Sequence, residues 1–597
     1  MRIKSLTLEQ LLYALAGLLA LGLRLWGLGT PALSEHEAQW ALQALNVARG
    51  QVQTLGGQPG YILFTSLLFG LLGSSNFLAR LLPALAGGLL PLLPGWIVPR
   101  LGRATHLRAA GVILAFGLAI DPGLLALSRT AGSPLMAVFF ALLALTLLGR
   151  GLPLWAGIAA GLALLSGPSV LQGLLVLLAG WGLIRLVETW LYPTSDGADQ
   201  PAPESLPRLS LPRLDAPGKR AAVIALLGTL LLAGTLLLRV PQGLGALVST
   251  FPAYFESLAH PAVFATLGTP VLTAPYQLLT LLVYHPLPLL FALIALVRGL
   301  IALRHGGQWA LRLSLWLLAA FLLALLVPDR QTGDLAWVLL PLWALAALEL
   351  ARYLPVGHQQ PTTLVAGGLA LLMVVMAAVL QFNQFSLARF EITPPLYAAM
   401  LGGVLVFSLV AIALVGMGWS GPAARLGAVW GICAVLLLGM FSAGSRLAYR
   451  TPNAAAELWS TPPSAGQMAE LVDTLQDLSA WNTGHTQELE VVVTADSPAL
   501  RWALRDFPQA RFVSGLAVNE TPAVVITALE AELPALELAY RGQDFIWQES
   551  PAWQGLLPAD AISWLSARQA PVIEQRVILW ARADLFPGGT TGPLSAP

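Results

Sequence analysis

The sequence is poor in charge and in cysteine. Asp, Glu, Lys and Arg make up 11% of its 597 residues, against about 25% in soluble globular domains. The net charge is only +1 and the basic residues are scattered, which excludes the concentrated basic face that nucleic-acid binding needs. The single cysteine, Cys433, excludes a disulfide or a cysteine-based metal site within one chain.

Apolar residues are abundant instead, at 56% of the chain. Their runs approach the length of about 20 residues that a helix needs to cross a bilayer, and the short alternating segments of a β-barrel are missing. The sequence therefore predicts a polytopic α-helical membrane protein with about thirteen spans. The predicted spans are 8–28, 80–99, 109–127, 134–149, 153–167, 170–190, 221–238, 276–297, 310–327, 335–351, 363–380, 398–417 and 426–443. The shorter apolar stretch 58–73 fits an interfacial or re-entrant helix.

The distribution of arginine and lysine predicts the orientation. With the N-terminus in the cytoplasm, the positive-inside rule is obeyed, and an odd number of spans places the C-terminal segment outside the plasma (inner) membrane. The predicted internal connections hold Arg100, Arg103, Arg108, Arg150, Arg208, Arg213, Lys219, Arg220, Arg298, Arg304, Arg312, Arg352 and Arg425. The predicted external loops hold chiefly Arg49, Arg129, Arg239, Arg330 and Arg389.

Composition divides the chain into two predicted domains, a membrane domain over 1–449 and a small extracytoplasmic α/β domain over 450–597. Within the first, 192–220 is rich in Pro, Ser and Asp and predicts a cytoplasmic linker, while 29–79 and 239–275 are external loops. Within the second, apolar runs predict buried strands and one amphipathic helix. The predicted strands are 488–495, 523–528, 544–549 and 576–582, and the predicted helix is 466–481.

The first external loop carries the sequence LSEHEAQW (33–40). Ser34 and Glu37 have the spacing of a capping box that begins a helix, which leaves Glu35 and His36 without a structural reason. The functional interpretation is a general base, since a carboxylate or imidazole can deprotonate an acceptor. A divalent cation, Mg or Mn, held by Glu35 or Glu37 is a further possibility, although three consecutive residues converge poorly on one ion.

Two parts of the chain resemble known families. The run RLWGLGTPALSEHEAQWALQALNVARG (24–50) resembles the first loop of the membrane-embedded GT-C glycosyltransferases, the protein O-mannosyltransferase and aminoarabinose-transferase superfamily. The segment 58–90, with its Ala-Arg-Leu entering the second span, and IDPGLLALSRTAGSP (120–134) are similar to the segments that follow in that family. Residues 497–513 and 576–587 resemble the C-terminal domain of the archaeal-type flippase-activity-associated family.

The resemblance implies a hexosyl- or pentosyltransferase that moves a sugar from a polyprenyl-phosphate carrier to an external protein, lipid or glycan. In that family an acid in the first loop is the base or holds a metal, and it corresponds here to His36-Glu37. Glu37 is the first candidate for the base and Glu35 the second. The family's leading Asp is replaced by His36.

Other departures concern the second external loop, which lies within 120–134, and the residue before Pro59. Gly132 and Ser133 stand where the family commonly has an acid, and Gln58 stands where related enzymes often carry Lys or His. These losses of charge keep a second interpretation open, a non-catalytic membrane protein that binds lipid-linked sugars or is associated with their flipping.

Cleavage of a sugar–phosphate bond leaves a phosphate dianion, which needs a cation nearby. The candidates for donor-phosphate binding are Arg129, Arg239, Arg330 and His285, with Gln58 added by the resemblance. Alternatives are open for three of them: Arg239 as a boundary anchor, Arg330 in a local pair with Asp329 or Asp334, and His285 as a polar neighbour of the kink at Pro286. Glu256 and His260, in the long loop 239–275, are candidates for acceptor contact, with simple exposure to solvent as the alternative.

Overall fold

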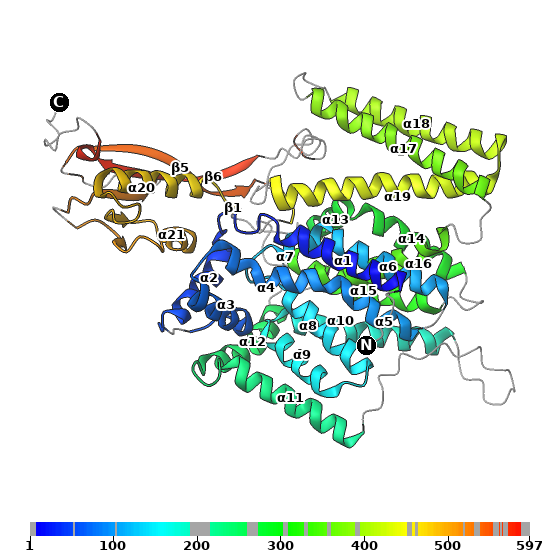
Figure 1. Cartoon of the computed structure of the whole chain (residues 1–597), viewed down its shortest axis with the longest axis horizontal. Coiled ribbons are helices and arrows are strands. Elements are labelled where there is room, and N and C mark those ends of the chain that lie inside the picture. Colours follow the sequence, from blue (N-terminus) through cyan, green and yellow to red (C-terminus); the bar gives the residue numbers. More distant parts are fainter. Residues whose placement is uncertain are drawn as a thin grey trace, which may run out of the picture.

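The structure is a computed structural model of the chain (Figure 1). It describes residues 7–51, 54–101, 104–191, 215–259, 273–301, 308–326, 332–354, 360–387, 394–450, 457–459, 464–517, 520–529, 536, 538–552, 560, 564 and 571–586. Most of the predicted cytoplasmic linker lies outside the described residues.

The described residues up to Arg450 are mainly helical. The helices up to the predicted linker are α1 (Leu8–Leu25), α2 (Glu35–Ala48), α3 (Pro59–Leu72), α4 (Asn76–Leu89), α5 (Leu93–Leu101), α6 (Thr105–Ile120), α7 (Pro122–Ser128), α8 (Leu135–Gly149), α9 (Pro153–Leu165) and α10 (Ser169–Leu191). Those after it are α11 (Ala216–Gly234), α12 (Gln242–Ala259), α13 (Thr273–Tyr284), α14 (Pro286–Ile301), α15 (Gln308–Leu326), α16 (Ala336–Leu350), α17 (Gln360–Leu387), α18 (Pro394–Gly418) and α19 (Gly421–Ser445), which continues into η5 (Arg446–Arg450).

The predicted class, a multi-pass helical membrane protein, is confirmed. Among the described residues, eight helices are long and apolar enough to cross a membrane, and ten if each of two bent pairs forms one span. Every predicted span overlaps one helix or a run of consecutive helices. Ten of the thirteen predicted spans fall on these long helices or bent pairs. The other three fall on α8, α9 and α15, which are apolar but shorter, so the count of about thirteen depends on whether these three cross the membrane.

Both bent pairs break at a proline. The axes of α6 and α7 differ by 53° and those of α13 and α14 by 97°, and the second helix of each pair begins with Pro122 or Pro286. Proline has no amide hydrogen to continue the helical bonding and its ring clashes with the preceding turn. The residues before the two prolines, Asp121 and His285, are thereby placed at helix breaks.

A mixed sheet follows the helices. Its strands are β1 (Ser464–Ala465), β2 (Val491–Val493), β3 (Ala510–Phe512), β4 (Val524–Ala528), β5 (Tyr540–Pro551) and β6 (Val572–Arg582), in the order β1-β5-β6-β4-β2-β3. β2 lies between β3 and β4 and is parallel to both, while the other pairs are antiparallel. With α20 (Met468–Thr483) and α21 (Pro498–Ala503), this confirms the predicted strands, helix and α/β class.

Figure 1 shows how the two parts are arranged. The sheet lies beyond the end of the helix bundle that also carries α2, α3 and α12, and α21 packs against α2. At another edge, α17 and α18 form a hairpin that packs chiefly on α19. The first-loop helix α2 is therefore placed between the membrane helices and the sheet domain.

Candidate functional site

The first-loop helix begins as the sequence predicts. Ser34 is the N-cap of α2, and its hydroxyl oxygen accepts a hydrogen bond from the amide of Glu37 at 3.4 Å. The Glu37 carboxylate accepts in return from the amide of Ser34 at 3.1 Å. The predicted capping box is confirmed, and it orients the Glu37 side chain back toward the start of the helix.

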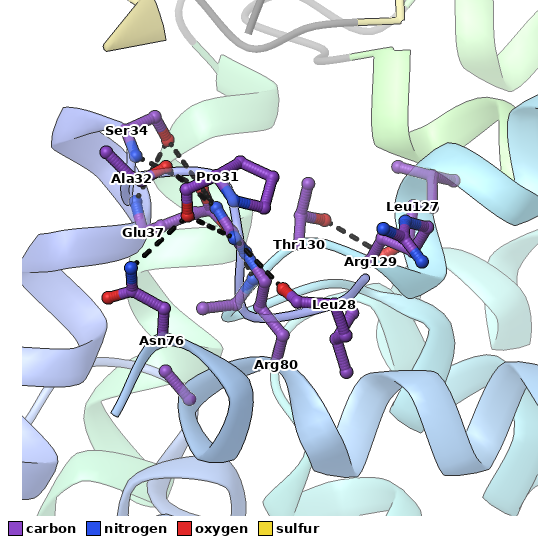
Figure 2. Close-up of polar contacts among 12 residues, drawn as sticks. Leu28, Pro31, Ala32, Ser34, Glu37, Asn76, Arg80, Leu127, Arg129 and Thr130 are labelled. Atoms are coloured by element: carbon purple, nitrogen blue, oxygen red, sulfur yellow. Dashed lines mark hydrogen bonds and ion pairs between the residues drawn. The ribbon is translucent and has the colours of Figure 1, made fainter. Parts of the chain in front are cut away.

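Glu37 is also half of a buried ion pair with Arg80 of α4 (Figure 2). The guanidinium donates from Nε to Oε1 at 2.7 Å and from Nη2 to Oε2 at 2.8 Å, and the two residues are 4% and 3% exposed. The amide of Ala131 donates to Oε1 at 2.9 Å. Although burial opposes ionisation, Arg80 and the hydrogen bonds from Ala131 and Ser34 hold the pKa of Glu37 below its ordinary value.

Arg80 uses its remaining donors on the chain that precedes α2. Nη1 donates to the carbonyl oxygens of Leu28 at 3.3 Å and Pro31 at 2.8 Å, and Nη2 donates to that of Ala32 at 3.0 Å. Figure 2 shows these carbonyls converging on one guanidinium. The Arg80–Glu37 pair therefore fixes the first loop to α4 and to the second loop.

Glu35 faces the sheet domain instead. Its Oε2 accepts from the Ser497 hydroxyl at 2.7 Å, the Ala499 amide at 3.2 Å and the Gln548 side-chain amide at 2.9 Å. Its other oxygen, Oε1, makes no hydrogen bond to any residue in the described ranges. The sheet domain thus holds one carboxylate oxygen of Glu35, and the second has no partner among the described residues.

Apolar and polar contacts around Glu35 strengthen the same interface. The Trp502 indole donates to Asn76 Oδ1 at 2.8 Å, and its ring lies 5.6 Å from that of Phe69. Arg505 donates from Nε to the Ser74 hydroxyl at 3.2 Å. Because residues of α21 and its C-terminal end contact α2, α3 and the start of α4, the sheet domain is fixed against the first loop.

His36 lies between the two carboxylates in sequence but contacts Trp40. The Trp40 indole donates to His36 Nε2 at 3.2 Å. Trp40 in turn packs on Gly132, which has φ +70° and whose carbonyl accepts from Gln58 Nε2 at 2.7 Å. Burial lowers the pKa of His36, opposed by the charge of Glu37. His36, Trp40, Gly132 and Gln58 therefore form one contiguous cluster, which we call the His36 cluster.

Gly132→Ala is expected to destabilise the protein by about 1–3 kcal/mol. An alanine Cβ there would lie 2.3 Å from Trp40 Cδ1, so the indole has to move, and left-handed backbone is unfavourable for alanine. Gly151→Ala is the matched control, since Gly151 has the same φ of +70° and nothing within 4 Å. Chemical unfolding in detergent measures both. Equal losses would show that the Trp40 contact contributes nothing.

The predicted phosphate-binding cation Arg129 is engaged with backbone. Its guanidinium donates to the carbonyls of Arg24 at 2.9 Å, Trp26 at 2.7 Å and Gly27 at 3.1 Å, and it lies 5.0 Å from the centroid of the Tyr449 ring. These carbonyls end α1, where helical acceptors lack partners. Arg129 thus closes a helix end beside the second loop.

His285 is completely buried at the break between α13 and α14. Its Nδ1 lies 2.9 Å from Asp121 Oδ2, the oxygen to which the Trp343 indole donates at 2.7 Å. Asp121 Oδ1 accepts from the amide of Leu124 at 2.8 Å and so begins α7. One carboxylate therefore joins the two helix breaks, with the Trp459 ring 5.6 Å from that of His285.

Two of the other predicted residues, Arg239 and Glu256, are among the described residues. Arg239 is exposed on the turn after α11, and Glu256 is exposed on α12. His260 and Arg330 lie outside the described residues. Over the described ranges, no group of three or more His, Cys, Asp or Glu side chains has the arrangement to hold a metal ion, so the divalent cation stays a prediction.

Two further charged residues, Arg80 and Asp121, belong to the groups around Glu37 and His285. Arg80 was part of the Ala-Arg-Leu resemblance but was not linked to Glu37. Asp121 lies in an apolar run, and a carboxylate there is costly unless it has a function or a partner. That cost was the available signal for Asp121, whereas only the fold brings Arg80 to Glu37, 43 residues away.

No protein-family model matches the chain, and no curated protein matches it in sequence. Among solved structures, it is similar to ArnT from Cupriavidus metallidurans bound to undecaprenyl phosphate, with 15% identity, a TM-score of 0.51 and coverage of 97% of this chain and 99% of that one. For the apo state of that protein the identity is 16%, the TM-score 0.50 and the coverage 97% and 98%. At these identities the similarity shows the fold alone, and the predicted GT-C-like fold is confirmed.

A more distant similarity is to the oligosaccharyltransferase from Archaeoglobus fulgidus in its apo form. Identity is 14%, the TM-score is 0.39, and the match covers 86% of this chain and 65% of that one.

Proposed function

We propose that the protein is a glycosyltransferase that moves a sugar from a polyprenyl-phosphate carrier to an acceptor outside the cytoplasm. The observation that carries this proposal is the fold, shared with ArnT over nearly the whole of both chains, sheet domain included. ArnT is an aminoarabinose transferase of the GT-C type, and its structure was solved bound to undecaprenyl phosphate. A carrier of that class is therefore the donor that we assign to this fold.

The proposed orientation puts the N-terminus in the cytoplasm and the sheet domain outside. It rests on the distribution of arginine and lysine in the sequence. The Glu35–Ser497 and Trp502–Asn76 contacts support one part of it, because they require α2 and the sheet domain to share a side of the membrane. The acceptor, a protein, lipid or glycan, then approaches from that side.

Glu35 is the better candidate for the base. A general base needs a lone pair within reach of the acceptor proton, and Glu35 Oε1 has no hydrogen bond in the described chain. Both oxygens of Glu37 are occupied by Arg80, Ala131 and Ser34. Glu37 then acts as a positioning residue that holds the first turn of α2.

Glu35→Gln is expected to lower turnover about 10²–10⁴-fold, the usual contribution of a general base, because glutamine keeps an oxygen acceptor but cannot take the proton. Purified protein would be assayed for release of polyprenyl phosphate from a panel of glycosylated carriers, with thermal unfolding measured in parallel. Glu37→Gln is the matched control and is expected to lose stability as well as activity. Full turnover in stable Glu35→Gln protein would overturn the assignment of the base.

A second candidate function is a non-catalytic protein that binds lipid-linked sugars. The observation that favours it is that Glu35, His36, Glu37 and Arg129 all have protein partners. The same assay separates the two functions. Saturable binding of carriers without turnover, unchanged in Glu35→Gln and in stable Glu37→Gln protein, would establish the binding role and exclude the transferase.

A further inference from the structure

In the His36 cluster, the proton on His36 is placed by Trp40. An indole nitrogen can only donate, so the Trp40 Nε1 contact at 3.2 Å makes His36 Nε2 an unprotonated acceptor. Burial also favours the neutral ring. In a neutral imidazole the single proton is then on Nδ1, and Nδ1 makes no hydrogen bond to any described residue. The group that His36 offers to a ligand is therefore an uncharged donor.

Gln58 offers the opposite group. Its Nε2 donates to the carbonyl of Gly132 at 2.7 Å, and a carbonyl can only accept, so the amide cannot be flipped. Oε1 is buried and has no partner among the described residues, and Gln58 as a whole is 9% exposed. A buried acceptor without a partner is unfavourable, so this oxygen is available to a donor that is not among the described residues.

The two groups are held by a continuous set of contacts. Trp40 connects His36 to Gly132, and Gly132 connects Trp40 to Gln58. Gly167, at φ +113°, leaves room for Gln58, because a Cβ there would lie 2.7 Å from Gln58 Cγ. The cluster thus combines one uncharged donor with one uncharged acceptor beside the first turn of α2.

We propose that the His36 cluster binds the sugar of the lipid-linked donor and takes an uncharged, hydroxyl-bearing sugar. A hydroxyl group has both a proton that can be donated to Gln58 Oε1 and lone pairs that can accept from His36 Nδ1. An ionised phosphate oxygen has no proton for Gln58, and an ammonium group on an amino sugar has no acceptor for His36. This inference rests on the proposed function, and it replaces the predicted contact of Gln58 with phosphate.

The test compares carriers with and without the sugar. Purified full-length protein would be titrated with undecaprenyl phosphate, with the same carrier bearing glucose, and with the carrier bearing an amino sugar. His36→Phe is expected to weaken binding of the glucose carrier about 5- to 10-fold, the range of one uncharged hydrogen bond, with binding of the bare carrier unchanged. His36→Asn keeps an amide donor near the Nδ1 position and should stay within about twofold of the wild type.

Three results would overturn the proposal. These are an equal loss for the bare and glucose carriers in His36→Phe, a preference of the wild type for the amino sugar, and binding of neither carrier by the wild type. Only the last would also overturn the proposed function, so the two failures are distinguishable.

A measurement without ligand covers the case in which the Phe variant does not fold. ¹⁵N spectra of histidine-labelled protein at pH 7 should show His36, assigned by its absence in His36→Asn, as the Nδ1–H tautomer. Trp40→Phe removes the donor that fixes this tautomer, so the Nε2–H form should also become populated. A charged ring or an Nε2–H tautomer in the wild type would contradict the proposal.

Discussion

Arg80→Leu is expected to destabilise the protein by about 3–5 kcal/mol, the usual cost of removing one partner from a buried ion pair. The Glu37 carboxylate would stay buried at 4% exposure without its cation. The carbonyls of Leu28, Pro31 and Ala32 would lose their donor as well. Unfolding of purified protein in detergent, followed by circular dichroism across a denaturant titration, measures the loss.

The double variant Arg80→Leu with Glu37→Leu separates the charge from the packing. Removing both charges leaves no buried carboxylate, so most of the lost stability should return. If the two single losses simply add in the double variant, the ion pair is not their cause.

Acid titration gives an independent check on the same pair. The pKa of Glu37 is lowered in the folded state, so the pair contributes stability fully above the ordinary glutamate pKa of 4.5 and loses it as the pH falls below that value. The wild type should therefore lose more stability than the double variant over that acid range.

Asp121→Leu is the second large effect, with an expected loss of about 3–5 kcal/mol. Its Oδ2 accepts from the Trp343 indole and contacts His285 Nδ1, and all three residues are buried. Leucine would leave two buried donors without an acceptor and would remove the cap of α7. Since Asp121 and His285 stand at the two helix breaks, the variant should also loosen α7 against α14, which hydrogen exchange of these segments measures.

Asp215→Leu is the matched control for Asp121→Leu. Asp215 caps α11 through a hydrogen bond from the amide of Gly218 at 2.9 Å and is exposed. Loss of such a cap costs about 0.5–2 kcal/mol. If Asp121→Leu costs no more than this, the contacts with Trp343 and His285 contribute nothing measurable.

Features that depend on neighbouring residues could be predicted from the sequence. Hydrophobic length located the membrane helices, and short apolar runs located four of the six strands of the sheet domain, β2, β4, β5 and β6. The capping box of Ser34 and Glu37 followed from their spacing alone. Each of these depends on residues within one or two turns or one strand, so the sequence contains the necessary information.

Features that depend on partners distant in the sequence could not be predicted. Glu37 was the first candidate for the base, but Arg80 and Ala131 occupy its oxygens, and neither is near it in sequence. Arg129 was expected near phosphate, yet the carbonyls at the end of α1 use its donors. The sequence around an arginine looks the same whether its guanidinium binds a ligand or the carbonyls at a helix end, so only the fold distinguishes the two roles.

The α17–α18 hairpin bears on how the number of membrane spans in such a chain can change. Only 17% and 6% of the residues in their apolar segments are buried, and their main contacts are with α19 and with each other. Two antiparallel spans return the chain to the side from which it left (Figure 1). The pair can therefore be gained or lost as a unit while the sheet domain keeps its side. Losing one span would reverse that side and separate Ser497 from Glu35, so the parity of the spans is constrained more tightly than their number.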